Sequence, residues 1–200
     1  MENNLQSLLG QTDIYLIDQI MKGRYTATDN ILDAGCGNGR NMFWFVQNGY
    51  NVNGIDNSEV AIAEIKDRYP GQSNHFGVAA IENSGFKDDH FDHIICSAVL
   101  HFAKSNAHFN SMLKELARIL KPGGSLFIRM TSDIGIEDKV KLIGDGVYLI
   151  PDGSTRFLLT RYLLIECMQQ YHFSFAEPVK TTNVADERCM STLVLQKNLF

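Results

Sequence analysis

Hydrophobic and polar positions follow two alternating patterns along this chain, and their order predicts strands and helices that succeed one another. Short apolar runs, typical of buried parallel strands, occupy residues 30–34, 50–56, 75–78, 91–97 and 124–130. Between them, apolar residues recur at helical spacing over residues 41–47, 58–68 and 106–120. Right-handed crossovers between such units predict a doubly wound, Rossmann-like α/β sheet with helices on both faces.

The two end portions of the chain predict additions to this core. Residues 5–21 carry a helical stripe that is interrupted near Gly10, which predicts helices ahead of the first strand. After a polar, glycine-containing stretch, residues 155–170 predict one long helix. Residues 173–184 and 190–196 then predict an antiparallel pair of strands. The complete prediction is a mostly parallel, seven-stranded sheet whose last strand is antiparallel.

Length and composition favour one globular domain over residues 1–200. The chain has 44% hydrophobic and 20% charged residues, which is ordinary for a globular protein. A single core usually serves chains of up to roughly 250 residues. We expect a helical lead-in (1–29), a cofactor-binding core (30–130), and a substrate-side segment with the closing strands (131–200).

Charge and cysteine usage narrow the expected partners and compartment. The net charge is −5 and no basic run occurs, so a nucleic-acid backbone is not an expected partner. No apolar stretch approaches the roughly 20 residues that cross a bilayer, and the start of the sequence lacks a signal-peptide pattern. The four cysteines stand far apart without a C-x-x-C pair. We therefore expect a cytoplasmic protein without a membrane partner.

A glycine-rich turn follows the first predicted strand, in the stretch ILDAGCGNGR from Ile31 to Arg40. Glycines allow a sharp turn between strand and helix, and because they lack Cβ they let a flat ligand approach the main chain. The spacing G-x-G-x-G differs from the G-x-G-x-x-G fingerprint of dinucleotide-binding folds. The amino terminus of the helix that follows could instead receive a carboxylate. A purely structural turn is the alternative interpretation.

Asp56 ends the second predicted strand. Nucleotide-binding α/β folds place a carboxylate there that accepts hydrogen bonds from both hydroxyls of a ribose. The alternative is that Asp56 caps the next helix, with Glu59 completing a capping box. The two roles are compatible, because Asn57 or Ser58 could cap instead.

The glycine turn and Asp56 occur with other ordered features over roughly residues 25–130, and together they resemble the class I S-adenosylmethionine-dependent methyltransferases. The other features are the strand VNGID, the loop AAIENSGFKDDHFDHIICS and the stretch ELARILKPGGSLFI. The resemblance implies a Rossmann-like fold, S-adenosylmethionine as cofactor and S-adenosylhomocysteine as product. It also implies methyl transfer as the activity.

The resemblance assigns cofactor contacts to Gly35, Cys36, Gly37, Asn38, Asp56, Asn57, Ala80, Ile81 and Ser97. Asp56 would hold the ribose, and Ile81 would meet the adenine. Many family members carry an acidic residue where this chain has Ala80, so adenine recognition would depend on backbone groups and on packing by Ile81 and Asn57. Ser97 would offer its backbone carbonyl to the ammonium group of the cofactor, unless it is an ordinary strand end.

Methyl transfer from a sulfonium requires mainly that donor and acceptor be aligned in a dry pocket. No protein nucleophile is obligatory, and a general base is needed only when the acceptor binds protonated. His101, after the fourth strand, is the candidate base or substrate contact, unless it only packs against a helix. Arg129 is a candidate partner for an anionic substrate or for an acidic neighbour. Tyr25 is a further candidate contact for a small-molecule acceptor, followed by Tyr148 and Arg156.

The sequence also contains one cluster of possible metal ligands, and its predicted fold allows two other functions. His90 and His93 lie among three aspartates, but alternation along a strand would scatter these side chains, so we expect no metal site. A nucleotide-dependent oxidoreductase and a cofactor-binding regulatory or scaffold protein without turnover are the two other functions that the fold would allow.

Overall fold

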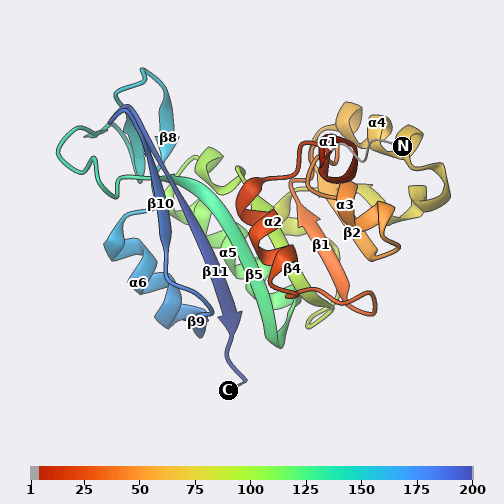
Figure 1. Ribbon diagram of the computed structural model, residues 1–200. Helices are drawn as coiled ribbons and strands as arrows, with labels where there is room; N and C mark the ends of the chain where they lie inside the picture. Colours follow the sequence, from red (N-terminus) through yellow and green to blue (C-terminus); the bar gives the residue numbers. More distant parts are fainter. Residues whose placement is uncertain (1–4, 200) are drawn as a thin grey trace.

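The computed structural model describes residues 5–199, and an eight-stranded sheet forms its centre (Figure 1). The strand order is β10-β11-β5-β4-β1-β2-β3, and β9 pairs with β11. The strands are β1 (Asn30–Ala34), β2 (Asn51–Asp56), β3 (Phe76–Val78), β4 (Phe91–Ser97), β5 (Leu120–Ser132), β9 (Phe173–Phe175), β10 (Lys180–Val184) and β11 (Arg188–Lys197). β1 to β5 are parallel, and β11 is antiparallel to β5. The predicted Rossmann-like sheet is confirmed, and β9 adds an eighth strand.

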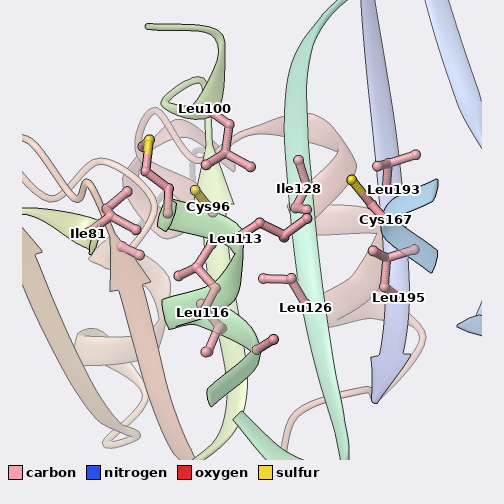
Figure 2. Packing of buried hydrophobic residues seen from close by; sticks show 14 of the residues in the cluster. Ile81, Cys96, Leu100, Leu113, Leu116, Leu126, Ile128, Cys167, Leu193 and Leu195 are labelled. Atoms are coloured by element: carbon pink, nitrogen blue, oxygen red, sulfur yellow. The ribbon is translucent and has the colours of Figure 1, made fainter. Parts of the chain in front are cut away.

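Helices cover both faces of this sheet because its side chains alternate between two hydrophobic clusters. The helices are α1 (Leu5–Leu9), α2 (Ile14–Met21), α3 (Phe43–Gln47), α4 (Glu59–Arg68), α5 (Asn106–Ile119) and α6 (Arg161–Gln170). Phe127 of β5 points to the cluster formed with α2, α3 and α4. Its neighbours Leu126 and Ile128 point to the other cluster, where Leu113 and Leu116 of α5 pack against the sheet (Figure 2). No helix within residues 5–199 combines the length and the apolar character that crossing a membrane requires.

Four of the helices begin at a side chain that caps the free backbone amides of the first turn. Asp13 accepts a hydrogen bond from Tyr15 N at the start of α2. The hydroxyl groups of Ser58, Ser105 and Thr160 accept bonds from backbone amides in the same way at α4, α5 and α6. Because Ser58 caps α4, Asp56 is not the cap of that helix.

The long helix predicted over residues 155–170 is wrong in its first part. Residues Thr155–Phe157 form strand β8, which pairs with β7 (Val147–Leu149), and α6 starts only after its cap Thr160. The reason is tertiary: the Phe157 side chain is buried and stacks on Phe109 of α5. A helix-compatible pattern of apolar residues was therefore overridden by packing.

Two more segments differ from their predicted form. The polar span before residue 155 contains β6 (Lys141–Leu142), which joins β7 and β8 in a separate three-stranded sheet. The strand predicted over residues 173–184 is divided into β9 and β10, with Pro178 in the gap between them. Proline lacks the N–H that a ladder requires, so it interrupts a strand.

Tyr25, predicted from the sequence to contact the acceptor, lies in the hydrophobic core instead. Its ring packs edge-on against Phe45 and His93, with both centroid distances at 5.0 Å. The side chain is buried, and among the described residues its hydroxyl group has no hydrogen-bond partner. A tyrosine in this place stabilises the packing of α3 on β4 and does not reach a ligand cavity.

Removing the Tyr25 hydroxyl should therefore not harm the protein. We expect Tyr25→Phe to raise the free energy of unfolding by about 1 kcal/mol, because an unpaired buried hydroxyl carries a desolvation cost. The matched control is Tyr50→Phe. The Tyr50 hydroxyl donates to the Tyr25 carbonyl at 3.4 Å, so its removal should be neutral or slightly destabilising. Urea denaturation measures both. A Tyr25→Phe variant less stable than Tyr50→Phe would contradict this assignment.

Candidate functional site

The candidate site lies at the carboxyl ends of the parallel strands, where the sheet order reverses. From β1 the chain continues to β2 and β3 on one side, and β4 and β5 occupy the other side. Open α/β sheets bind ligands at this kind of reversal, because the connections diverge there and leave a crevice. A cavity of about 600 Å³ is present at these strand ends, within the usual size range of ligand pockets.

All nine residues that the sequence assigned to the cofactor line this cavity, namely Gly35, Cys36, Gly37, Asn38, Asp56, Asn57, Ala80, Ile81 and Ser97. Several lining residues were missed, and they are Arg40, Asn41, Ala79, Glu82, Ala98, Val99, Phe102, Lys104, His108 and Met112. Most of the missed residues lie on the turn after β4 or on α5. Whether these residues line the cavity depends on how α5 packs over the sheet. No local sequence motif therefore predicts them.

Two glycines of the turn have different physical reasons to be glycine. Both have a left-handed backbone, with φ of +77° at Gly35 and +53° at Gly37. A Cβ on Gly35 would come within 2.5 Å of Val99 Cγ2, so a side chain there collides with the wall of the cavity. A Cβ on Gly37 would meet nothing within 4 Å. Gly37 therefore leaves open space beside the main chain in the cavity that it lines.

The backbone amides of the turn are already bonded within the protein. Gly35 N and Cys36 N both donate to the Ile55 carbonyl, at 2.8 and 2.9 Å. Gly37 N donates to Asp56 Oδ2 at 2.8 Å, and Gly39 N donates to the Cys36 carbonyl at 2.9 Å. A pyrophosphate-binding turn presents such amides to its ligand. These four amides are already bonded within the protein, so they are not free to hold a pyrophosphate.

The helix that follows the turn does not offer the carboxylate site that the sequence suggested. α3 has only five residues and begins at Phe43, well beyond Gly37, and its cap residue Met42 makes no side-chain capping bond. Arg40, which lines the cavity, is the cationic side chain closest in sequence to the turn. A carboxylate in this cavity would therefore be held by a side chain and not by a helix terminus.

Asp56 presents a prearranged carboxylate at the end of β2. Its Oδ2 accepts from Gly37 N, and its Oδ1 accepts from Ser58 N at 2.9 Å. These two bonds hold the carboxylate in one orientation at the cavity wall. A carboxylate has about four acceptor positions, so both oxygens keep capacity for hydroxyl donors. The arrangement suits a vicinal diol such as that of a ribose.

The far end of the cavity combines apolar and acidic groups. Ile81 is buried at the start of a short 3₁₀ turn, Ile81–Asn83, directly after Ala80. Position 80 is an alanine and not an acidic residue, but this turn places Glu82 among the residues that line the cavity. Glu82 Oε1 lies 3.3 Å from His108 Nε2 of α5. An acidic group is therefore present two residues later than expected.

Asp13 connects the amino-terminal helices to the strand ends through hydrogen bonds. This role of Asp13 was not predicted from the sequence. Its Oδ2 accepts from Ser97 Oγ at 3.3 Å and from Arg129 Nη1 at 3.2 Å. Its own backbone N donates to Asn41 Oδ1 at 3.0 Å. The side chain is 3% exposed, so this is a buried ion pair with several hydrogen bonds. Arg129 thus has an acidic neighbour, one of the two alternatives left open by the sequence.

A second cavity of about 230 Å³ adjoins the first, and Ala98 lines both. Its lining residues are Ala98, His101, Arg129, Thr131, Arg156, Thr182, Val184, Arg188 and Met190. The structure therefore brings together His101, Arg129 and Arg156, three of the predicted acceptor-side residues. Tyr148, a further candidate, lies on β7 and lines neither cavity.

His101 is a hydrogen-bond donor in this arrangement. Its Nδ1 accepts from Thr131 N at 3.3 Å, which leaves the proton of the neutral ring on Nε2. Burial, together with the nearby charges of Arg156, Arg188 and Arg129, lowers the pKa of His101 to about 4. The ring is therefore neutral at pH 7 with its proton on Nε2, and its Nδ1 lone pair is already engaged by Thr131 N.

Asp33 is a buried carboxyl group directly before the glycine turn. It is 1% exposed, and its Oδ2 has no hydrogen-bond partner within residues 5–199. Burial raises its pKa to about 7, a net value in which the charge of Arg40 opposes the rise and the charge of Asp56 supports it. Close to neutral pH, this group therefore changes its protonation state.

The aspartate and histidine cluster near β4 is divided among separate ion pairs. Asp92 pairs with Lys121, Asp88 pairs with Arg118, and His93 bonds to Asp29 and Ser125. Within residues 5–199, no three side chains of the metal-binding types converge on one point.

Comparison with known proteins identifies the family. A sequence model described as a methyltransferase domain matches residues 32–128, the span from β1 to β5. An uncharacterized methyltransferase of Schizosaccharomyces pombe is 30% identical over 107 residues, which cover 52% of this chain and 73% of that protein. The chain belongs to the class I S-adenosylmethionine-dependent methyltransferase family. The family hypothesis drawn from the glycine turn and Asp56 is confirmed.

Other methyltransferase relatives are longer than the region they share with this chain. The uncharacterized methyltransferase YodH of Bacillus subtilis is 30% identical over 56% of this chain and 44% of its own length. The 27-O-demethylrifamycin SV methyltransferase of Amycolatopsis mediterranei is 30% identical over 62% of this chain and 49% of its own length. The chain thus spans less than half the length of these two methyltransferase relatives.

Solved methyltransferase structures share the fold at lower identity. A SAM-dependent methyltransferase from Methanosarcina mazei superposes with a TM-score of 0.71 at 21% identity, covering 90% of this chain and 98% of that one. The 1,6-didemethyltoxoflavin-N1-methyltransferase of Burkholderia thailandensis, solved with its substrate and S-adenosylhomocysteine, has a TM-score of 0.69 at 16% identity. That alignment covers 98% of this chain and 81% of the other.

The buried Asp33 carboxyl should make stability depend on pH. Its folded pKa lies above the unfolded value of 3.8, so its stabilising contribution is complete below pH 3.8 and is lost as the pH rises through about 7. Asp33→Asn cannot ionise. Relative to this variant, the wild type should lose on the order of a few kcal/mol of unfolding free energy between pH 5 and pH 8.5.

Urea denaturation of the two proteins at both pH values measures that difference. Asp67→Asn, an exposed change on α4, is the matched control and should differ from the wild type equally at both pH values. A wild-type to Asp33→Asn difference that stays constant across this range would refute the assignment.

Proposed function

We propose that this protein transfers a methyl group from S-adenosylmethionine to a small-molecule acceptor by in-line displacement. The observation that carries the proposal is the cavity at the ends of β1, β2 and β4, where the fixed Asp56 carboxylate lies next to Gly37 and its open space. This pair suits a ribose and a closely packed main chain. Family membership supplies the reaction class.

The lining residues fit the parts of this cofactor. Asp56 would accept the two ribose hydroxyls, and Ile81 and Asn57 would hold the adenine beside Ala80. The amino-acid portion would lie along Gly35 to Asn38, with Ser97 at its ammonium group and Arg40 at its carboxylate. Bound there, the cofactor supplies a methyl group on a sulfonium, and displacement by an acceptor lone pair leaves a neutral thioether.

The acceptor would occupy the second cavity, because Ala98 forms a shared wall with the first. Ala98 has a left-handed φ of +63°, and its N donates to the Arg129 carbonyl at 2.7 Å. The strained backbone at Ala98 lines both the cavity proposed for the donor and the cavity proposed for the acceptor. Alignment of the methyl donor and the acceptor across Ala98 would supply most of what catalysis requires. His101 would contribute a hydrogen bond and would not act as a base.

The named relatives support a small acceptor. The rifamycin and toxoflavin methyltransferases act on small molecules according to their names. A second cavity of about 230 Å³ likewise suits part of a small molecule. An oxidoreductase using a dinucleotide is disfavoured, because the turn amides that would hold a pyrophosphate are committed to Ile55, Asp56 and Cys36.

Organisation and location follow as further parts of the proposal. The bonds from Asp13 to Ser97 and Arg129 attach the amino-terminal helices to the core, which supports one domain over residues 1–200. All four cysteines are buried and unpaired, which supports a reducing, cytoplasmic setting. The net charge of −5 supports an acceptor other than nucleic acid.

Asp56 provides the direct test of cofactor binding. Asp56→Asn removes the negative charge and one acceptor oxygen, so its affinity for S-adenosylmethionine should fall by about 1–3 kcal/mol, measured by isothermal titration calorimetry. Asp67→Asn, an exposed position on α4, should bind like the wild type. NAD should not compete. Equal affinity of the Asp56→Asn protein and the wild type would exclude the ribose role.

Turnover distinguishes an enzyme from a protein that only binds the cofactor. The wild type, incubated with S-adenosylmethionine labelled in its methyl group and with a small-metabolite extract, should yield a labelled product and S-adenosylhomocysteine. The Asp56→Asn protein at subsaturating cofactor should yield less of both. Cofactor binding without any labelled product from extracts of several sources would favour a non-catalytic binding protein.

A further inference from the structure

The second cavity is positively charged although the protein is acidic. Three arginines converge on it, Arg129 from β5, Arg156 from β8 and Arg188 from β11. Among the described residues that line it, none is an aspartate or glutamate. Since the whole chain carries a net charge of −5, such a collection of guanidinium groups is a local feature and not an effect of composition.

Two of these arginines are held in place by aromatic rings. The Arg129 guanidinium lies 5.3 Å from the centre of the Tyr15 ring and donates from Nη1 to Asp13. The Arg156 guanidinium lies 5.3 Å from the centre of the Phe102 ring, and Phe102 lines the cofactor cavity. Stacking on a ring restricts a guanidinium while leaving its N–H groups at the edge for other acceptors.

The carboxylates near these arginines do not satisfy them. Asp13 bonds to Arg129 through Nη1, but Arg129 Nε is buried without a hydrogen-bond partner within residues 5–199. Asp152 lies 3.9 Å from Arg188 Nη1, beyond hydrogen-bond distance. Three guanidinium groups therefore lie near only two carboxylates in the described part of the chain. One of these carboxylates, Asp152, is beyond hydrogen-bond distance of its arginine.

The other polar groups of the cavity are also donors or are already occupied. His101 carries its proton on Nε2, since its Nδ1 accepts from Thr131 N, so it can donate from that nitrogen. The Thr131 hydroxyl donates to Met190 Sδ at 3.4 Å, and the Thr182 hydroxyl bonds to the Tyr15 hydroxyl. A cavity that offers N–H groups and few acceptors is complementary to an oxyanion.

We infer that the methyl acceptor carries a carboxylate or phosphate group and that Arg156, Arg188 and Arg129, with His101, bind this group in the second cavity. The inference rests on the proposed function and names the class of its substrate. Because Ala98 separates the two cavities, the methylated atom of the acceptor lies close to its anionic group, on the side facing the cofactor.

The arginines that can be replaced without loosening the fold are Arg156 and Arg188. Arg129 is unsuitable, because its bond to Asp13 also holds α2. The Arg188 side chain is 49% exposed, and among the described residues the Arg156 side chain donates a hydrogen bond only to the carbonyl of its neighbour Thr155. The matched control is Arg161→Met on α6, an exposed arginine that lines neither cavity and pairs with Glu137.

The first experiment measures oxyanion binding without the cofactor. The wild type is titrated with sodium acetate or with inorganic phosphate at constant ionic strength, and the melting temperature is followed. We expect saturable stabilisation by at least one of the two anions, and the stronger response identifies the carboxylate or the phosphate class. Arg156→Met and Arg188→Met should weaken this binding roughly tenfold or more, as loss of a charged hydrogen bond does, and Arg161→Met should not.

The second experiment tests substrate class with labelled cofactor. Candidate acceptors are offered in pairs, each carboxylate or phosphate ester beside its neutral amide or alcohol. Only the anionic member of a pair should be methylated, and Arg156→Met or Arg188→Met should abolish that preference while affinity for S-adenosylmethionine stays at the wild-type value. Equal methylation of neutral members, or no saturable effect of either anion on the wild type, would overturn the inference.

The two failures are distinguishable. If S-adenosylmethionine does not bind the wild type, the proposed function fails, and the acetate and phosphate titrations still report on the arginine cavity. If the cofactor binds and neutral acceptors are methylated equally well, the proposed function stands and the anionic substrate class is wrong.

Discussion

The parallel pairing of β1 with β2 on one side and with β4 on the other is the constraint on which the rest of the structure depends. This pairing reverses the strand order at β1 and opens a crevice at the strand ends. The same register sets Ala34 opposite Ile55, so the turn after β1 meets the end of β2. Gly37 N therefore reaches Asp56, and one hydrogen bond fixes both the turn and the carboxylate.

A second level of organisation comes from the amino-terminal segment. Asp13 caps α2 and at the same time accepts hydrogen bonds from Ser97 and Arg129 at the ends of β4 and β5. Tyr15 extends this contact to Thr182 of β10. In Figure 1, α2 crosses in front of the central strands, between the glycine turn and the antiparallel edge. The lead-in thus organises the boundary between the two cavities and is not a peripheral addition.

The two cavities differ in their charged groups. The first combines the carboxylates of Asp56 and Glu82 with the cations Arg40 and Lys104, and backbone amides fix the Asp56 carboxylate. The second contains guanidinium groups and a neutral histidine donor. In a region of low dielectric, fixed charges of opposite sign placed a short distance apart orient a ligand more strongly than they would in water. The arrangement gives donor and acceptor different electrostatic environments on the two sides of Ala98.

The sequence by itself determined the succession of parallel strands and helices along the chain, and its family resemblance pointed to nine residues that line the first cavity. These features are local, since the glycine turn and Asp56 each follow directly from a strand end. Only the tertiary structure decided that Phe157 belongs to a strand and that Tyr25 is in the core, because burial against other elements overrode their local patterns. The second cavity also needed the fold, because its arginines lie on β5, β8 and β11, which are distant in sequence and belong to two different sheets.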